Sequence, residues 1–131
     1  MQTAIFGQMP VKKLLSIEKE QESKVKDKFL DKITLFFIQK NAAINETMII
    51  KKNSEIDLIV EIPEEHGTKK YYCKAKNKKS INETDLTNAF IKGHGKGLPV
   101  FFITSGEATN DAKALLESDL KNGFVFAKLS K

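Results

Sequence analysis

The stretch from Ser54 to Lys79 carries the residues of this chain whose types and spacing could do chemistry. Its first segment, SEIDLIVEIP, alternates, so that Glu55 and Asp57 share one face and apolar residues share the other. Such alternation is typical of a strand with one polar and one apolar side. The segment YYCKAKNKK also alternates and follows a polar turn, so hairpin pairing would put Lys74 on the face of Asp57. A carboxylate can hold a hard divalent cation, and a neighbouring lysine can activate water or stabilise charge developing on a phosphate.

The order of EIDLIV, a turn and YCKAK resembles the PD-(D/E)XK restriction-endonuclease-like superfamily with an Mrr-type core. The resemblance covers most of the chain in the order of its expected elements. It implies an α/β, three-layer fold in which helices flank a central mixed sheet, in the order α-β-β-β-α-β-α-β. It also implies that Asp57 and Lys74 are catalytic, that the cofactor is Mg²⁺ with Mn²⁺ as a substitute, and that the substrate is DNA. The E-x-K glutamate of the family falls at Tyr72, which offers no carboxylate.

Other carboxylates are metal-ligand candidates through the same resemblance. Glu55 would accompany Asp57 on its strand, and Glu22 would approach from the first helix, as a glutamate does in some members. Glu83 or Asp85, on the helix after the hairpin, would replace the missing glutamate, as in some branches of the superfamily. The residues alone leave a second interpretation open, in which these carboxylates are solvated surface groups. An E-x-D pair is common on an exposed strand face, and Glu22 lies in a charged run.

The charge of the chain favours a polyanionic partner. The sequence has 22 lysines and no arginine against 17 acidic residues, which gives a net charge of +5. Lysine binds phosphate but reads base edges poorly compared with arginine, so we expect DNA binding of low sequence specificity. Compositional bias, or lysines that protect an edge strand, would explain the charge equally well. The candidate nucleic-acid contacts are Lys76, Lys78, Lys79 and Lys96.

Apolar periodicity places the remaining elements around the hairpin. A helical pattern fills residues 11–39, a short strand is expected at 48–50, and LPVFFIT is typical of a central strand. A helix is expected over Asn82–Lys92, with Leu86, Ala89 and Phe90 on its buried side. A second helix is expected over 110–121, followed by a closing strand at 124–129. Strands that alternate with helices predict an α/β sheet covered on both sides.

Length and composition limit the remaining possibilities. We expect a single domain over residues 1–131, with a helical lead-in at about 1–21. No apolar run approaches the ~20 residues that span a bilayer, and no signal peptide is visible, so we expect a cytoplasmic protein without a membrane partner. One cysteine excludes an internal disulfide. A homodimer and a longer parent polypeptide both remain open.

Two classes of function follow. The first is a nuclease-like DNA-binding domain, either a metal-dependent endonuclease (a hydrolase) with a non-standard site or a catalytically degraded member of that fold. The second is an α/β protein-interaction or assembly module without a role on nucleic acid. The position of Tyr72, where the chemistry requires a carboxylate, favours the degraded form.

Overall fold

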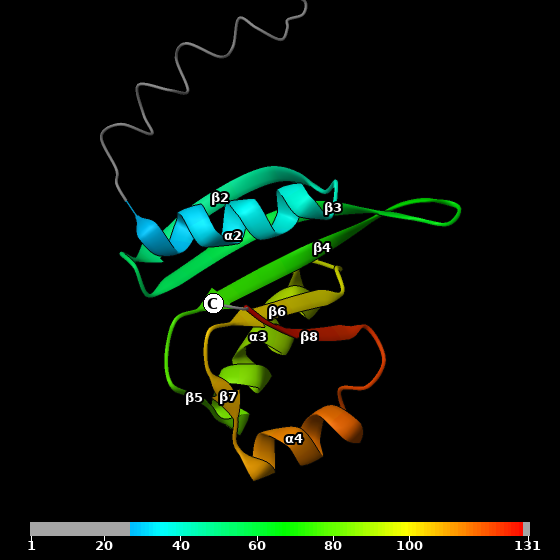
Figure 1. The fold of residues 1–131 in the computed structure, drawn as a ribbon. Coiled ribbons are helices and arrows are strands. Elements are labelled where there is room, and N and C mark those ends of the chain that lie inside the picture. The colour runs from blue at the N-terminus through cyan, green and yellow to red at the C-terminus, as the bar shows by residue number, and fades with distance from the viewer. Residues whose placement is uncertain (1–26, 130–131) are drawn as a thin grey trace, which may run out of the picture.

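A five-stranded mixed sheet between helices forms the centre of the computed structural model, which describes residues 27–129 (Figure 1). The strand order is β2-β3-β4-β6-β8. This confirms an α/β fold with a central mixed sheet flanked by helices. The expected lead-in at 1–21 and the metal candidate Glu22 lie outside the described residues.

The first three strands form an antiparallel meander. β2 spans Ala43–Lys51, β3 spans Glu55–Glu64 and β4 spans Gly67–Lys76. β3 is hydrogen-bonded to β2 on one side and to β4 on the other. β2 is longer than the expected strand at 48–50. The alternation of its residues is weak, because the pairing with β3 shifts register at two places and because Met48 and Ile50 are exposed.

The second half of the chain adds two parallel strands. β6 (Val100–Thr104) pairs with β4, and β8 (Phe124–Lys128) pairs with β6. Each connection carries a helix, as parallel pairing requires a crossover. These helices are α3 (Glu83–Gly95) and α4 (Asn110–Glu117). The structure also contains a two-stranded parallel ribbon that the expected element order lacks. It pairs β5 (Ser80–Ile81) with β7 (Glu107–Ala108).

Helix α2 (Lys28–Gln39) covers one face of the sheet. Its apolar stripe of Phe29, Ile33 and Phe37 is buried in one cluster with the strand residues that point to this face of the sheet. The N-cap of the helix is Asp27, whose carboxylate accepts hydrogen bonds from the backbone N–H of Leu30 and of Asn53. One buried aspartate therefore caps α2 and fixes it to the β2–β3 turn. The strand residues in this cluster include Ile56, Leu58, Val60, Tyr71, Cys73 and Ala75.

Helices α3 and α4 cover the opposite face, where the second apolar cluster contains Tyr72, Leu86, Ala89 and Phe102. A side chain at Gly93 would come within 2.5 Å of the Val100 side chain, so glycine at this position lets α3 approach the sheet closely. Close approach brings the polar flank of α3 to the strands that carry Asp57 and Lys74. The cluster also holds Ile81, Val100, Ala112, Leu120 and Phe124.

Two expectations about these helices are wrong in detail. Phe90 does not lie on the buried side of α3, since it is 38% exposed and its ring stacks on His94. α4 ends at Glu117 rather than at residue 121. The Ser118 hydroxyl donates to the carbonyl oxygens of Ala114 and Leu115, and such local bonds compete with continuation of a helix.

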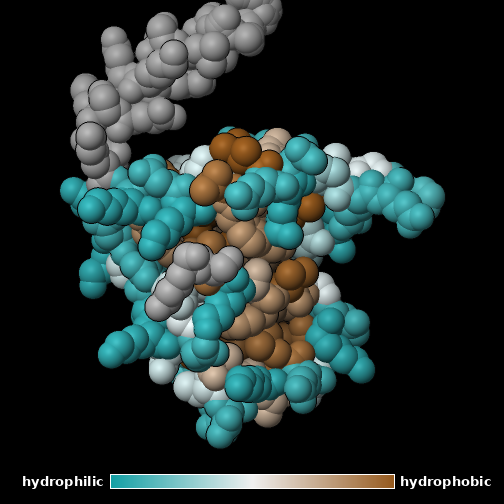
Figure 2. All heavy atoms as spheres, viewed as in Figure 1, coloured by the Kyte–Doolittle hydropathy of each residue, from teal (hydrophilic) through white to brown (hydrophobic). Residues whose placement is uncertain are grey.

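Hydrophilic residues cover the outer parts of the surface seen in Figure 2. A band of apolar residues crosses the middle of this view, where Figure 1 places β6 and β8. β8 is the last strand of the sheet, so both clusters come to the surface beside it. Within residues 27–129, no helix is both long and apolar enough to cross a membrane.

Candidate functional site

Asp57 and Lys74 lie directly opposite each other on β3 and β4, which confirms the predicted pairing. The Lys74 Nζ is 2.7 Å from Asp57 Oδ1 and 2.5 Å from Glu55 Oε2. All three side chains are on the face of the sheet that α3 covers, because strand residues two apart point the same way. Asp57 and Lys74 are only 8% and 7% exposed, respectively. The sequence pattern therefore located a real cluster of buried charges.

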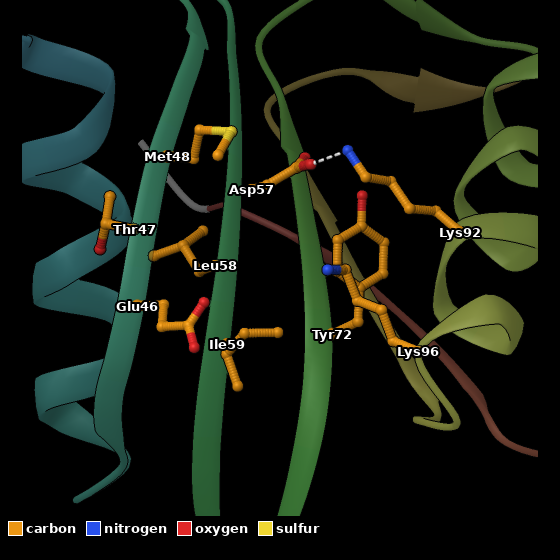
Figure 3. Close-up of a pocket in the computed structure, with 9 residues that line it drawn as sticks. All are labelled: Glu46, Thr47, Met48, Asp57, Leu58, Ile59, Tyr72, Lys92 and Lys96. Atoms are coloured by element: carbon orange, nitrogen blue, oxygen red, sulfur yellow. Dashed lines mark hydrogen bonds and ion pairs between the residues drawn. The ribbon is translucent and has the colours of Figure 1, made fainter.

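Lys92 completes this cluster, although it is not among the site residues predicted from the sequence. It reaches from α3 to Asp57, and its ammonium forms an ion pair with Asp57 Oδ2 (Figure 3). The signal that could have found it is helical spacing: Asp85, Ala89 and Lys92 recur at steps of four and three residues, with Lys96 one turn further on. Since Asp85 and Ala89 are buried, this flank of α3 must face the strands.

The site is one end of a chain of alternating charges, here called the charge chain. Asp85 is bound by two lysines, Lys78 at 2.8 Å and Lys76 at 2.9 Å. Lys76 lies 3.9 Å from Glu55, which connects to the rest of the cluster. Each carboxylate thus lies between two ammonium groups, so the buried charges are compensated locally. In order, the charge chain is Lys78, Asp85, Lys76, Glu55, Lys74, Asp57 and Lys92.

These partners decide the protonation of the central pair. Burial alone would raise the pKa of the Asp57 carboxyl, but Lys74 and Lys92 outweigh it and hold this pKa below its ordinary value of 3.8. Burial would lower the pKa of the Lys74 ammonium, yet Asp57 and Glu55 raise it above 10.5. At neutral pH both groups are charged. Lys74 can therefore donate hydrogen bonds and stabilise negative charge, but it cannot take a proton from water.

Asp85 has a structural role at the start of α3. Its carboxylate accepts a hydrogen bond from the backbone N–H of Asn82, whose side chain in turn accepts from the backbone N–H of Asp85. Although burial opposes it, Lys78, this backbone bond and Lys76 hold the pKa of Asp85 below its ordinary value. Glu83, the other metal candidate on this helix, is exposed and forms no ion pair with any residue of the described part.

Tyr72 occupies the position where the resemblance requires a glutamate. Its ring is fully buried, and its hydroxyl points toward the Asp57 carboxylate (Figure 3). Burial, together with the negative charge of Asp57, raises the pKa of this hydroxyl far above 10.0, so the phenol is neutral. The Tyr72 hydroxyl and Asp57 Oδ1 are both shielded from solvent, and the Lys74 ammonium, 2.7 Å from Oδ1, is the partner of that oxygen.

A cavity of about 140 Å³ opens beside this cluster, between β2, β3, β4 and α3 (Figure 3). Met48, Ile59 and Tyr72 give it apolar walls, while Lys92 and Lys96 reach toward it from α3. The cavity exists because α3 packs over β4 and β6 and leaves the face of β2 and the outer part of β3 uncovered. Its lining residues are Glu46, Thr47, Met48, Asp57, Leu58, Ile59, Tyr72, Lys92 and Lys96.

The four lysines predicted to contact nucleic acid fall into two groups. Lys76 and Lys78 are held by Asp85 in the charge chain, so their charges are already compensated. Lys79 and Lys96 are exposed and form no ion pair with any described residue. Of these two, Lys96 lines the cavity.

The described residues do not fit a magnesium site. No group of three or more histidine, cysteine, aspartate or glutamate side chains in this part of the chain could hold a metal ion together. Asp57 and Glu55 are each engaged by lysine ammonium groups, and Tyr72 replaces the expected carboxylate. Mg²⁺ requires near-octahedral oxygen ligands, which two lysine-bound carboxylates do not supply.

No family model matches the chain, and comparisons with curated proteins and with solved structures likewise found no match. The site is therefore defined by its own geometry: a compensated buried charge pair, a neutral buried tyrosine and a small cavity with two lysines at its opening.

Proposed function

We propose that this domain binds the phosphate backbone of DNA at the surface formed by β2, β3, β4 and α3, as a nuclease-like domain without efficient cleavage. The resemblance of EIDLIV and YCKAK to the PD-(D/E)XK superfamily supports the proposal. So does the position of Asp57 and Lys74, which face each other on adjacent antiparallel strands beside a covering helix.

The observation that carries the proposal is the pair of lysines at the cavity opening. Lys92 lies in the last turn of α3 and Lys96, four residues further on, is the C-cap of this helix with helical backbone angles, so their side chains emerge from the same side. Like charges at this spacing destabilise a helix slightly, and a polyanion would offset that cost. Of these two lysines, only Lys92 is ion-paired to Asp57, and its side chain remains 45% exposed. A phosphate can therefore reach both ammonium groups from solvent.

The protonation states support binding rather than hydrolysis. Cleavage by this architecture needs carboxylates to hold a metal ion and a group to activate water. Here Tyr72 is a neutral phenol, Lys74 is a stable ammonium ion, and both strand carboxylates are bound to lysines. The charge chain has one more lysine than it has carboxylates, so its partly exposed end at Lys92 can bind an anion.

The test is the salt dependence of binding to a fluorescein-labelled DNA duplex, followed by fluorescence anisotropy. Each phosphate contact contributes about 0.9 to the slope of log affinity against log salt concentration. Lys96→Gln should lower the slope by about this amount and weaken binding to all sequences alike. Lys121→Gln, which removes the same charge from an exposed position after α4, is the matched control and should leave the slope unchanged.

Two outcomes would reject the proposal. Absence of DNA binding even at low salt would favour the α/β protein-interaction or assembly module. An equal loss of affinity in Lys96→Gln and Lys121→Gln would show that net charge, and not this surface, attracts the DNA.

A further inference from the structure

We infer that the Lys74 ammonium takes the place of a divalent cation in this protein, because Glu55 and Asp57 form a cation site that the chain fills with its own side chain. The two strand carboxylates predicted to hold a metal ion do lie together, but a lysine is bound between them. This goes beyond the proposed function, since none of the three residues has to contact DNA for it to hold.

Two carboxylate oxygens of one strand converge on this ammonium. The Lys74 Nζ lies 2.5 Å from Glu55 Oε2 and 2.7 Å from Asp57 Oδ1. Glu55 and Asp57 are two residues apart on β3, so both point to the face of the sheet on which Lys74 lies opposite Asp57. Protein oxygens bind Ca²⁺ at about 2.3–2.6 Å, a range close to these two distances. A cation at the position of the ammonium would therefore meet both oxygens with little movement of either side chain.

The second oxygen of each carboxylate is turned toward a different lysine. Asp57 Oδ2 is ion-paired to Lys92 on α3, and Glu55 Oε1 lies 3.9 Å from the Nζ of Lys76. These contacts do not involve Lys74. Removal of the Lys74 side chain would therefore leave them in place and free only the two oxygens that converge on its ammonium.

The fold needs a cation at this position. Asp57 and Lys74 are buried, and Asp57 Oδ1 is shielded from solvent. Without a positive charge between them, two neighbouring carboxylates repel each other and lose hydration that nothing replaces. The chain supplies this charge through a side chain tethered to β4, which a chelator cannot remove. The stability of the wild-type protein should therefore not depend on divalent cations.

A divalent cation can use this position only when the ammonium is absent. Ca²⁺ takes about six to eight oxygen ligands in a flexible geometry. The two converging oxygens supply part of this set, and water can reach the position past the Glu55 side chain, which is 26% exposed. A site with two carboxylates belongs with the weak Ca²⁺ sites of proteins, whose dissociation constants are on the order of 1 mM. Lys74→Glu adds a third carboxylate directly opposite Asp57, at a Cβ–Cβ distance of about 5 Å, and should bind more tightly.

The experiment is urea unfolding of the full chain, followed by circular dichroism, in Ca²⁺ and in potassium chloride of equal ionic strength. For Lys74→Ala, about 10 mM Ca²⁺ should raise the folding equilibrium constant roughly ten-fold, as a dissociation constant of about 1 mM requires. Lys74→Glu should respond more strongly, and the wild type should not respond. Lys78→Ala is the matched control, because Lys78 belongs to the same charge chain but is ion-paired to Asp85 alone, so its removal opens no position between two carboxylates.

Loss of folding in a Lys74 variant does not end the test, because metal binding and folding are coupled. A variant that is unfolded without Ca²⁺ and folds when Ca²⁺ is added would support the inference. Three results would overturn it: no gain from Ca²⁺, Mg²⁺ or Mn²⁺ in either Lys74 variant, an equal gain in Lys78→Ala, or Ca²⁺ binding by the wild type. Each of these results leaves the proposed DNA binding standing, since no DNA is present.

Discussion

Replacing Asp57 by asparagine tests whether the charge chain stabilises the fold. The substitution keeps the shape of the side chain but removes the charge between Lys74 and Lys92. Lys74 is then a buried ammonium ion with Glu55 as its remaining partner, whereas Lys92 can turn to solvent. Breaking a fully buried ion pair costs about 3–5 kcal/mol, and an exposed pair contributes about 0–1 kcal/mol. With one partner retained, we expect a loss of about 1–3 kcal/mol in the free energy of unfolding at neutral pH.

The pH dependence of this loss identifies its cause. The folded-state pKa of Asp57 lies below its value in the unfolded chain, so its charge stabilises the fold at pH values above about 4. This contribution disappears as the pH falls through the folded-state pKa. Urea unfolding followed by circular dichroism, repeated from neutral to acidic pH, gives the free energy at each pH. The difference between wild type and Asp57→Asn should be constant near neutrality and shrink in acid.

Glu107→Gln is the control for a charge in an exposed ion pair, because within residues 27–129 the Glu107 carboxylate is ion-paired to Lys128 alone and its side chain is 70% exposed. It should leave the unfolding curve unchanged within error. Equal or greater stability of Asp57→Asn at neutral pH would refute the argument that these buried lysines need their carboxylate. A loss that is independent of pH would assign the effect to packing rather than charge.

Two further predictions concern helix packing and metal binding. Gly93→Ala should destabilise the fold by about 1–3 kcal/mol in urea unfolding, because the added methyl group would lie 2.5 Å from the Val100 side chain, whereas Gly95→Ala, with open space around it, should cost less. Calorimetric titration with Mg²⁺ or Mn²⁺ should show no binding at millimolar concentration, and neither ion should support DNA cleavage, since each candidate strand carboxylate is bound to lysine. Cleavage that Asp57→Ala abolishes would contradict this account and support the metal-dependent endonuclease.

The hairpin with Asp57 and Lys74 could be predicted because its information is local. Alternation on each strand assigns the two side chains to faces, and a short turn limits the register. The α/β class was predictable for the same reason, since LPVFFIT is a continuous apolar segment between helical patterns. The alternation of YYCKAKNKK likewise assigns Cys73 to the apolar face: it is fully buried, and burial keeps its thiol protonated by raising its pKa.

Features that depend on contacts between distant segments could not be read from the sequence. The pairing of Lys92 with Asp57 spans 35 residues and requires the approach that Gly93 permits between α3 and β6. The use of Asp85 as a helix cap bound by two lysines depends on where β4 ends relative to α3. Phe90 was misplaced because the apolar flank of α3 is narrow and turns away from it toward Leu86 and Ala89.

The central claim is that DNA binds over the cavity between β2, β3, β4 and α3. The most direct test is a titration of the ¹⁵N-labelled chain with a DNA duplex at low salt, followed by amide chemical shifts. Binding at this surface should shift the amides around Met48, Asp57, Tyr72, Lys92 and Lys96, and leave those of α4 and the exposed face of α2 unchanged. Shifts confined to α4 or α2, or no shifts at any DNA concentration, would contradict the account.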